Sequence, residues 1–282
     1  MKPRRNLRAT RNATLDKLAD WLVGELRKVR RNPDDAEAVH DARVAARRLL
    51  AAGELWAAPA AAWANVRDRL PSIVRRLGHV RNLDIVLDLL RKGTPEDAGA
   101  RKELSRHLRK DRKEARIEMA DWLTKRKVDR IRSGMKTVVR EVRQKPVLDA
   151  PSPSDLGPHF ARVMSLFTGR AWAPSAEEAH AIRREVRRLR YAHETLQWAY
   201  EAEQFKRVVK TLHKIQELAG AWQDRCILEK FAAKAIRRGK VSSPLTGFLS
   251  RIQAESKSLA DRFVRAAMEL ADLRQLIVGD IR

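Results

Sequence analysis

The strongest constraint on the fold is a sequence motif that occurs twice, at a constant offset of 140 residues. Each copy has a histidine, an arginine three residues later, and an Arg-Arg-Leu run beginning four residues after that arginine; the histidines are His40 and His180. A weaker match follows each copy, Gly-x-x-x-Asn from Gly78 and Gly-x-x-x-Asp from Gly220. Because two ordered motifs recur at similar spacing, the sequence indicates an internal duplication.

Nearly every segment has the pattern of an α-helix. The prolines stand where helices begin or end, as in the capped turns beginning at Asn32 and Thr94, and Ser175-x-x-Glu178 has the pattern of a capping box. No segment shows sustained alternation of apolar and polar residues, so a sheet has no support. We therefore predict an all-α fold with helices near residues 14–31, 34–57, 60–91 (with Pro71 as a candidate break), 95–127, 128–144, 159–170, 175–200, 203–219, 222–238 and 245–277.

A stretch rich in proline and serine divides the chain almost in half. It reads PVLDAPSPSDLGP and has the composition of a connector. The sequence thus predicts a basic N-terminal arm over residues 1–13, a first helical half over 14–145, a connector over 146–158 and a second helical half over 159–282.

The repeated motif predicts a helix with one apolar side and one basic side, since successive helical residues turn by about 100°. In the first copy the apolar side holds Ala38, Val39, Ala42, Ala45, Ala46, Leu49 and Leu50; in the second it holds Ala179, Ile182, Val186 and Leu189. The first motif stripe, on the basic side, is His40, Arg43, Arg47 and Arg48. The second motif stripe is His180, Arg183, Arg187 and Arg188.

Each motif stripe points to an anionic ligand. Three guanidinium groups within two helical turns repel one another, and a bound anion offsets that repulsion. Arginine also donates two hydrogen bonds at once to phosphate oxygens. A further helix in the second half carries Arg207, Lys210 and Lys214 within about 60° of each other. In the first half Arg69 and Arg76 align similarly, although they are not register equivalents of the two lysines.

The charge of the whole chain points the same way. Lysine and arginine total 60 against 36 aspartate and glutamate, a formal net charge of +24. A surface this basic repels itself unless it meets a polyanion, which leaves nucleic acid, an anionic membrane face or a phosphate polymer as partners.

The paired motifs resemble those of the CHAD domain (conserved histidine, α-helical domain), and the resemblance runs from about residue 14 to the end. It is carried by VHDARVAARRLL with LGHVRNLDIVL and by AHAIRREVRRLRYAHETL with LAGAWQDRCIL. It implies two helical bundles related by a pseudo-twofold axis, with basic residues lining a central groove or cavity. It also implies binding of inorganic polyphosphate and association with polyphosphate granules.

The resemblance further implies that both motif stripes contact the ligand, with Arg81 and the helix bearing Lys210 and Lys214 as additions. One departure is Leu50, where the second copy has Arg190, so the two halves need not contribute equally. We expect non-catalytic binding of polyphosphate in a shared basic groove, with Arg76 and Arg207 included among the binding residues and with no cofactor. Polyphosphate carries charge but no bases, so affinity must come from electrostatics and counterion release. Histidines facing the anion would strengthen binding as the pH falls below about 6.5.

A non-specific nucleic-acid-binding protein is the alternative. Such proteins combine basic residues with aromatic platforms on which bases stack. Aromatic residues here make up only 5% of the chain, and most of the tryptophans stand at apolar positions of their helices. Tyr191 is the exception, because its helical angle places it among the arginines of the second motif stripe.

An enzyme with a di-metal site, or a metal-dependent phosphohydrolase, is the second alternative. Glu37-x-x-His40 and Glu177-x-x-His180 have the spacing used in di-iron carboxylate bundles. Such ligands must project toward the apolar interior, whereas both histidines fall on the arginine side. We therefore predict no metal site, no catalytic residues and no enzymatic activity.

The remaining composition bears on location. A single cysteine, Cys226, excludes an intrachain disulfide and a multi-cysteine zinc site. The longest stretch without an ionisable side chain, Leu55 to Val66, is well short of the roughly 20 residues of a membrane span. No apolar signal core follows the basic N-terminus. We expect a cytoplasmic protein without membrane association.

Overall fold

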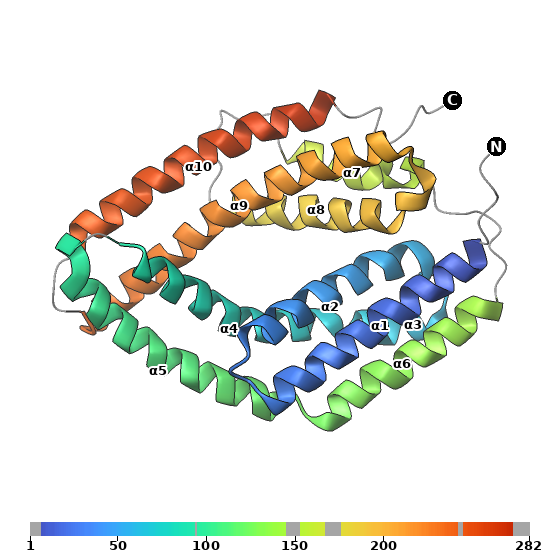
Figure 1. Cartoon of the computed structure of the whole chain (residues 1–282), viewed down its shortest axis with the longest axis horizontal. Coiled ribbons are helices and arrows are strands. Elements are labelled where there is room, and N and C mark those ends of the chain that lie inside the picture. The colour runs from blue at the N-terminus through green and yellow to red at the C-terminus, as the bar shows by residue number, and fades with distance from the viewer. Residues whose placement is uncertain (1–6, 94, 145–152, 167–175, 242–244, 273–282) are drawn as a thin grey trace. The chain divides into compact units, whose positions relative to one another are not determined.

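The computed structural model describes residues 7–93, 95–144, 153–166, 176–241 and 245–272. Over these residues the secondary structure is helical and contains no strand (Figure 1), which confirms the predicted all-α class. Short 3₁₀ turns lie at Pro95–Asp97, Pro153–Leu156 and Gln197–Ala199. The α-helices are α1 (Leu7–Arg31), α2 (Ala36–Trp56), α3 (Ala61–Arg67), α4 (Leu70–Arg91), α5 (Ala98–Trp122), α6 (Lys125–Gln144), α7 (Gly157–Ser165), α8 (Ala176–Thr195), α9 (Ala202–Arg237) and α10 (Thr246–Asp272).

The chain divides into two compact units whose segments interleave in sequence. Unit 1 comprises residues 1–81, 114–152 and 194–198, and unit 2 comprises residues 82–113, 153–193 and 199–282. Helices α4 and α5 therefore each contribute to both units. The assignment of the two sequence halves to duplicated bundles stays a prediction.

In unit 1, α1 packs against both α2 and α6, and α3 packs against α6 (Figure 1). The apolar side of α1 supplies Leu15, Leu22 and Leu26, all fully buried. Burial at this spacing stabilises the helix, because most of the stability of a helix in a protein comes from packing of its apolar face rather than from intrinsic propensity. One end of α3 is fastened to α6 where the Glu141 carboxylate accepts a hydrogen bond from the Ala62 amide at 3.0 Å.

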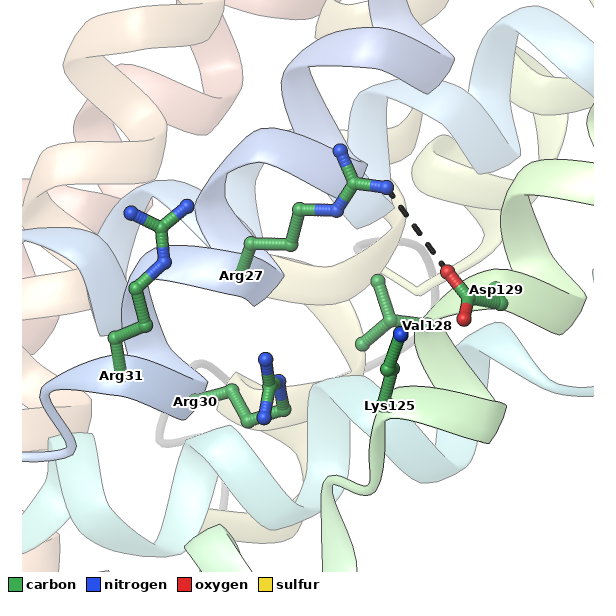
Figure 2. Close-up of a pocket in the computed structure, with 6 residues that line it drawn as sticks. All are labelled: Arg27, Arg30, Arg31, Lys125, Val128 and Asp129. Atoms are coloured by element: carbon green, nitrogen blue, oxygen red, sulfur yellow. Dashed lines mark ion pairs between the residues drawn. The ribbon is translucent and has the colours of Figure 1, made fainter.

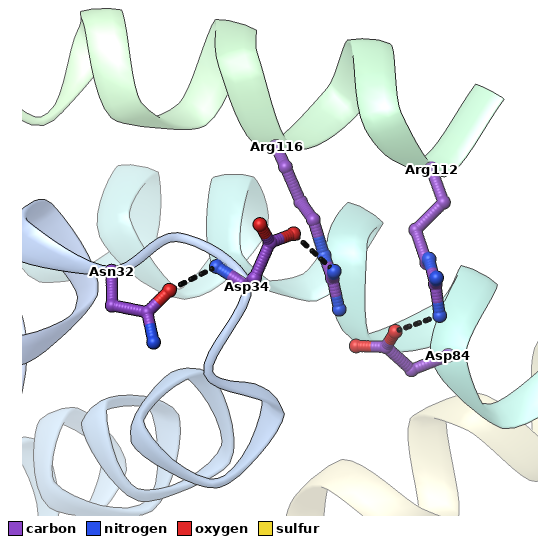
Figure 3. A network of polar contacts seen from close by, with 5 residues as sticks. All are labelled: Asn32, Asp34, Asp84, Arg112 and Arg116. Atoms are coloured by element: carbon purple, nitrogen blue, oxygen red, sulfur yellow. Dashed lines mark hydrogen bonds and ion pairs between the residues drawn. The ribbon is translucent and has the colours of Figure 1, made fainter. Parts of the chain in front are cut away.

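The turn between α1 and α2 is held by polar contacts. The Asn32 amide oxygen accepts from the Asp34 backbone N–H at 3.1 Å, and the Asp34 carboxylate accepts from Arg116 of α5 (Figure 3). Asp35 then caps α2 by accepting from the backbone N–H groups of Glu37 and Ala38. The helix therefore begins at the Asn-Pro-Asp-Asp segment as predicted, but its cap is Asp35 rather than Asn32, and Pro33 precedes the helix instead of lying in its first turn.

In unit 2, α9 and α10 pack along each other, and the Arg225 guanidinium of α9 donates two hydrogen bonds to Glu255 of α10, at 3.0 and 3.1 Å. The first turn of α10 is capped from a distant part of the chain. The buried carboxylate of Asp97 accepts from the Phe248 amide at 3.1 Å and from the Arg251 guanidinium at 3.0 Å.

Unit 2 also contains a polar contact on α4 and a buried polar pair. Arg112 of α5 lies 3.4 Å from the Asp84 carboxylate of α4 (Figure 3). His193 of α8 is fully buried and its Nδ1 is hydrogen-bonded to the Tyr200 hydroxyl. Burial lowers the pKa of His193 to about 3, so this imidazole is neutral at physiological pH.

Several helix boundaries differ from the expected ones. Helix α5 ends at Trp122 and α6 begins at Lys125, whereas the boundary was expected between residues 127 and 128, and α8 ends at Thr195 rather than at residue 200. Helix α1 begins at Leu7, so residues 7–13 of the expected N-terminal arm are helical. The expected helix over 60–91 breaks at residues 68–69 rather than at Pro71, which lies in the first turn of α4 where proline is tolerated. The two helices expected on either side of Gly220 are one continuous helix, α9. Ser175 of the expected capping box lies outside the described residues.

Candidate functional site

Helix α2 buries its apolar side and turns the first motif stripe away from it. Ala38, Val39, Ala42, Ala45, Ala46 and Leu49 are buried, and Leu50 alone of the predicted apolar set is only partly covered. His40 is exposed, while Arg43, Arg47 and Arg48 are half-buried. The predicted division of this helix into a core side and a basic side is therefore what the structure shows.

His40 stands in a strongly positive environment. Its pKa is lowered, first by partial burial and then by the charges of Arg81, Arg43 and Arg47, against an opposing contribution from Asp41. The structure thus brings Arg81 of α4 close enough to His40 to act on its protonation. A neutral imidazole surrounded by guanidinium groups becomes protonated more readily when an anion approaches.

Part of the hydrogen-bonding capacity of Arg43 is used by contacts within the protein. Its guanidinium donates to the Val74 carbonyl of α4 at 2.6 Å and lies directly against the Cα of Gly78, where any larger side chain would overlap it. Gly78, the glycine of the Gly-x-x-x-Asn match, therefore leaves space for Arg43 of the first motif stripe. This contact gives Gly78 a reason to be glycine within a helix, where glycine otherwise costs about 1 kcal/mol relative to alanine.

The other cations of unit 1 also have protein partners. Arg48 pairs with Glu194 at 2.9 Å and stacks over the Trp21 ring of α1 at 5.7 Å. Arg76 is exposed on α4 and lies over the Trp122 ring at 5.8 Å. Both arginines keep exposed surface, since Arg48 retains 38% of its side-chain area.

In unit 2, α8 repeats the relation seen on α2. His180 is exposed, and its pKa is lowered first by partial burial and then by Arg183, Arg184 and Arg187. The Arg183 guanidinium comes within 3.2 Å of where a Cβ on Gly220 would stand, and within 4.0 Å of the Asp224 carboxylate. Burial lowers the pKa of Arg183 while Asp224 opposes that shift.

The C-terminal end of the second motif stripe lacks the exposed tyrosine ring that the nucleic-acid alternative requires. Arg187 and Arg188 are half-buried, and Arg188 lies 3.6 Å from Glu185. Tyr191, however, is buried, and Arg190 covers its ring at 4.7 Å. Arg190 is itself buried and donates to Gln216 at 2.9 Å. The expectation that Tyr191 is displayed among the arginines is therefore wrong, because helical angle alone did not reveal that this ring is buried beneath Arg190.

The basic residues of α9 lie on another side of that helix. Lys214 forms an ion pair with Glu269 of α10 at 2.8 Å. Arg207 and Lys210 are exposed within about 60° of Lys214, whereas Gly220 and Asp224, which meet α8, lie further round. The structure brings Arg183 and Asp224 together, but it directs Lys214 toward α10.

Two polar residues beside the second motif stripe were missed by the sequence reasoning. Gln223 of α9 is buried close to His180, and its side chain raises the pKa of His180 against the effect of the arginines. Arg184, exposed and one turn from His180, adds to the local positive charge. Arg184 has Val44 as its counterpart in the first copy, so it is not part of the repeated motif.

Neither a metal cluster nor a membrane span is found in the described residues. No group of three or more His, Cys, Asp and Glu side chains lies together there in a way that could hold a metal ion. None of the described helices is both long and apolar enough to cross a membrane.

Comparison with known proteins identifies the family. The family model described as the CHAD domain matches residues 13–233. The chain therefore belongs to the CHAD domain family. A search of curated proteins gave no match.

A solved structure supports the fold. The crystal structure of the CHAD domain from the plant Ricinus communis superimposes with a TM-score of 0.69 at 20% sequence identity, covering 98% of this chain and 92% of that one. At this identity the likeness concerns the fold alone.

Proposed function

We propose that this protein binds inorganic polyphosphate non-catalytically through the two motif stripes, each acting within its own unit. The observation that carries the proposal is the electrostatic environment of the repeated histidines. In each unit the histidine pKa is lowered by three arginines in addition to partial burial. Charges of one sign gathered this closely on a half-buried surface favour a ligand of the opposite sign.

The proposed ligand is a polyanion without bases. Single-stranded nucleic-acid sites supply exposed aromatic rings for stacking, and the aromatic residue expected to do so beside the second stripe, Tyr191, is buried. Trp21 and Trp122 are instead covered by Arg48 and Arg76. Guanidinium groups that can donate two hydrogen bonds to a phosphate, with no exposed aromatic ring beside them, suit a chain of phosphate groups.

The non-catalytic part of the proposal rests on the neighbours of the histidines. A metal-activated water would need several carboxylate or imidazole ligands around a cation. The charged neighbours of His180 are arginines, and His40 has three arginines against the single carboxylate of Asp41, so positive charge that repels a metal ion predominates at both. A protein that only holds long phosphate chains would also collect on polyphosphate granules, and we include that association in the proposal.

The test is a titration of the purified protein with long-chain polyphosphate, in competition with single-stranded DNA and RNA of equal charge. The double variant Arg47→Ala, Arg187→Ala should weaken polyphosphate binding by at least about tenfold, since it removes one phosphate-facing cation from each stripe. Arg43 and Arg183 are avoided because they also hold the fold.

The matched control is Arg106→Ala, Arg109→Ala, which removes the same charge from exposed positions of α5. It should change affinity by no more than about twofold to threefold. Equal losses in both variants would show that only net charge matters and would contradict a site on the stripes. Equal affinity for nucleic acid and polyphosphate, or release of phosphate from the polymer, would overturn the proposal.

A further inference from the structure

A second basic surface lies in unit 1 along the line where α1 and α6 pack together. On α6, Lys125, Arg132, Lys136, Arg140 and Arg143 fall within about 80° of one another around the helix. All five are exposed. From the first to the last they span about 27 Å at 1.5 Å per residue. We call these five residues together with Arg27, Arg30 and Arg31 of α1 the α1–α6 seam.

The seam is hollowed at two places. Near the end of α1 and the start of α6, a cavity of about 270 Å³ is lined by Arg27, Arg30, Arg31, Lys125, Val128 and Asp129 (Figure 2). Further along, a hollow of about 450 Å³ is lined by Asp16, Lys136, Val139, Arg140, Arg143 and Gln144. Each hollow therefore has an apolar valine and several cations in its wall.

Positive charge predominates in both hollows. The first is lined by four cations and one carboxylate, with Arg27 and Asp129 3.9 Å apart. The second is lined by three cations and one carboxylate, with Arg143 and Asp16 2.9 Å apart. One carboxylate in each hollow orients one arginine and leaves the hollow with a net positive charge.

The seam is separate from the first motif stripe. Arg48 of that stripe stacks over Trp21, which lies about 140° around α1 from Asp16 and about 120° from Arg27. Helix α1 packs against α2 and α6, and the side that carries Trp21 differs from the side that carries Asp16 and Arg27. No residue of the seam belongs to the repeated motif.

We propose that the α1–α6 seam is a second binding track for a phosphate chain without bases, used by long polyphosphate in addition to the motif stripes. None of the residues lining the two hollows is aromatic, so bases would find no stacking surface there. The exposed large apolar residues of the described chain, Ile117, Ile236 and Met268, lie on α5, α9 and α10, so no apolar anchor for a membrane accompanies the seam. A thin, flexible polyanion can enter both hollows, whereas a flat bilayer cannot.

The inference rests on the proposed function, because both name the same ligand. The test compares the full chain with two charge-matched variants of α6 in titrations with long-chain sodium polyphosphate. The seam variant is Lys136→Ala, Arg140→Ala. The control variant is Arg126→Ala, Arg130→Ala, whose residues are equally exposed but lie about 80° to 120° away from the middle of the row around α6.

The seam variant should bind about tenfold more weakly than the control, and the slope of log affinity against log salt should fall by about 1.5. Bound polyphosphate should also protect Lys136 from acetylation more than Lys257 of α10, which is exposed in unit 2. If the two α6 variants bind polyphosphate with equal affinity, and bound polyphosphate does not protect Lys136 from acetylation, the proposed binding track on the seam is wrong. Loss of single-stranded DNA binding alone in the seam variant would overturn it in favour of a nucleic-acid track. Absence of polyphosphate binding by the unaltered chain would instead refute the proposed function.

Discussion

Arg43 and Arg183 occupy the same position of the repeated motif, and each is pressed against a glycine of a later helix of its own unit, Gly78 of α4 and Gly220 of α9. Arg43 also donates to a main-chain carbonyl, and Arg183 approaches a carboxylate. These contacts explain why the arginine and the glycine recur as a pair. They make both arginines positioning residues that hold the motif helix, while Arg47 and Arg187 remain the better candidates for ligand contact.

This relation predicts an unusual response to alanine substitution. Gly24→Ala, at a position with open space around the added Cβ, should raise the free energy of unfolding by about 0.5–1 kcal/mol. Gly78→Ala should instead lower it by about 0.5–1 kcal/mol, because the methyl group displaces Arg43 from Val74 and the lost charged hydrogen bond outweighs the gain in helix propensity.

Chemical denaturation of the two variants measures the difference. Introducing Gly78→Ala into an Arg43→Ala background provides the control, since the substitution should then stabilise the protein as Gly24→Ala does. A gain of stability from Gly78→Ala in the unaltered chain would show that the guanidinium moves aside without cost.

The repeated histidines predict a pH dependence of binding. Burial and neighbouring arginines lower the pKa of His40 and His180 in the unliganded protein, so both are mainly neutral at pH 7.5. A bound polyanion favours the protonated form and raises both values. Affinity should therefore increase as the pH falls from 7.5 to 5.5, by up to about tenfold per pH unit for each histidine that takes up a proton.

Titration calorimetry across this pH range, with proton uptake measured in two buffers, tests the point. The double variant His40→Gln, His180→Gln should flatten the profile. His213→Gln, which removes an exposed histidine of α9, should leave it unchanged. An identical pH profile in the double variant and the unaltered protein would contradict contact between the two histidines and the anion.

Among the helices, α10 depends on a residue far from it in sequence. Asp97 caps its first turn and also accepts from Arg251. We expect Asp97→Ala to lower the free energy of unfolding by about 2 kcal/mol, because a helix cap and a charged hydrogen bond are lost together. Asp97→Asn keeps an acceptor for the Phe248 amide and should cost about half as much.

Hydrogen exchange of the Phe248 and Leu249 amides locates the effect. Asp88→Ala, which removes an exposed ion pair with Lys92, is the control and should cost less than about 0.5 kcal/mol. Unchanged protection of the first turn of α10 in Asp97→Ala would mean that the cap is dispensable.

The helix boundaries show what local sequence can decide. The start of α2 was predictable because residues with capping side chains cluster there and act on amides within three residues, although which of them forms the cap, Asp35, was not. The continuity of α9 through Gly220 was not, because a glycine weakens a helix by its intrinsic propensity, whereas Gly220 is buried and lies beside Arg183 of another helix. The helical start of α1 at Leu7 has a similar cause, since Arg11 is buried and donates to the Val142 carbonyl of α6.

At the scale of the whole molecule, the net charge of +24 is distributed over surfaces with different surroundings. Part of it forms the two motif stripes, and part forms the α1–α6 seam. Some of the remainder is engaged within the protein, as in the pairing of Arg225 with Glu255. A total charge thus predicts the class of partner, whereas only the neighbours of each cation decide where that partner can bind.

The sequence by itself determined the all-α class and the division of the motif helices into apolar and basic sides, because helical periodicity and capping are local properties. It also determined the repeated histidines and arginines, which follow from the order of residues alone. Only the tertiary structure decided that Tyr191 is buried, that Lys214 pairs with Glu269, and that a second row of cations lines α1 and α6. Each of these facts depends on which helix packs against a given side chain, and this is determined by contacts between residues far apart in the chain.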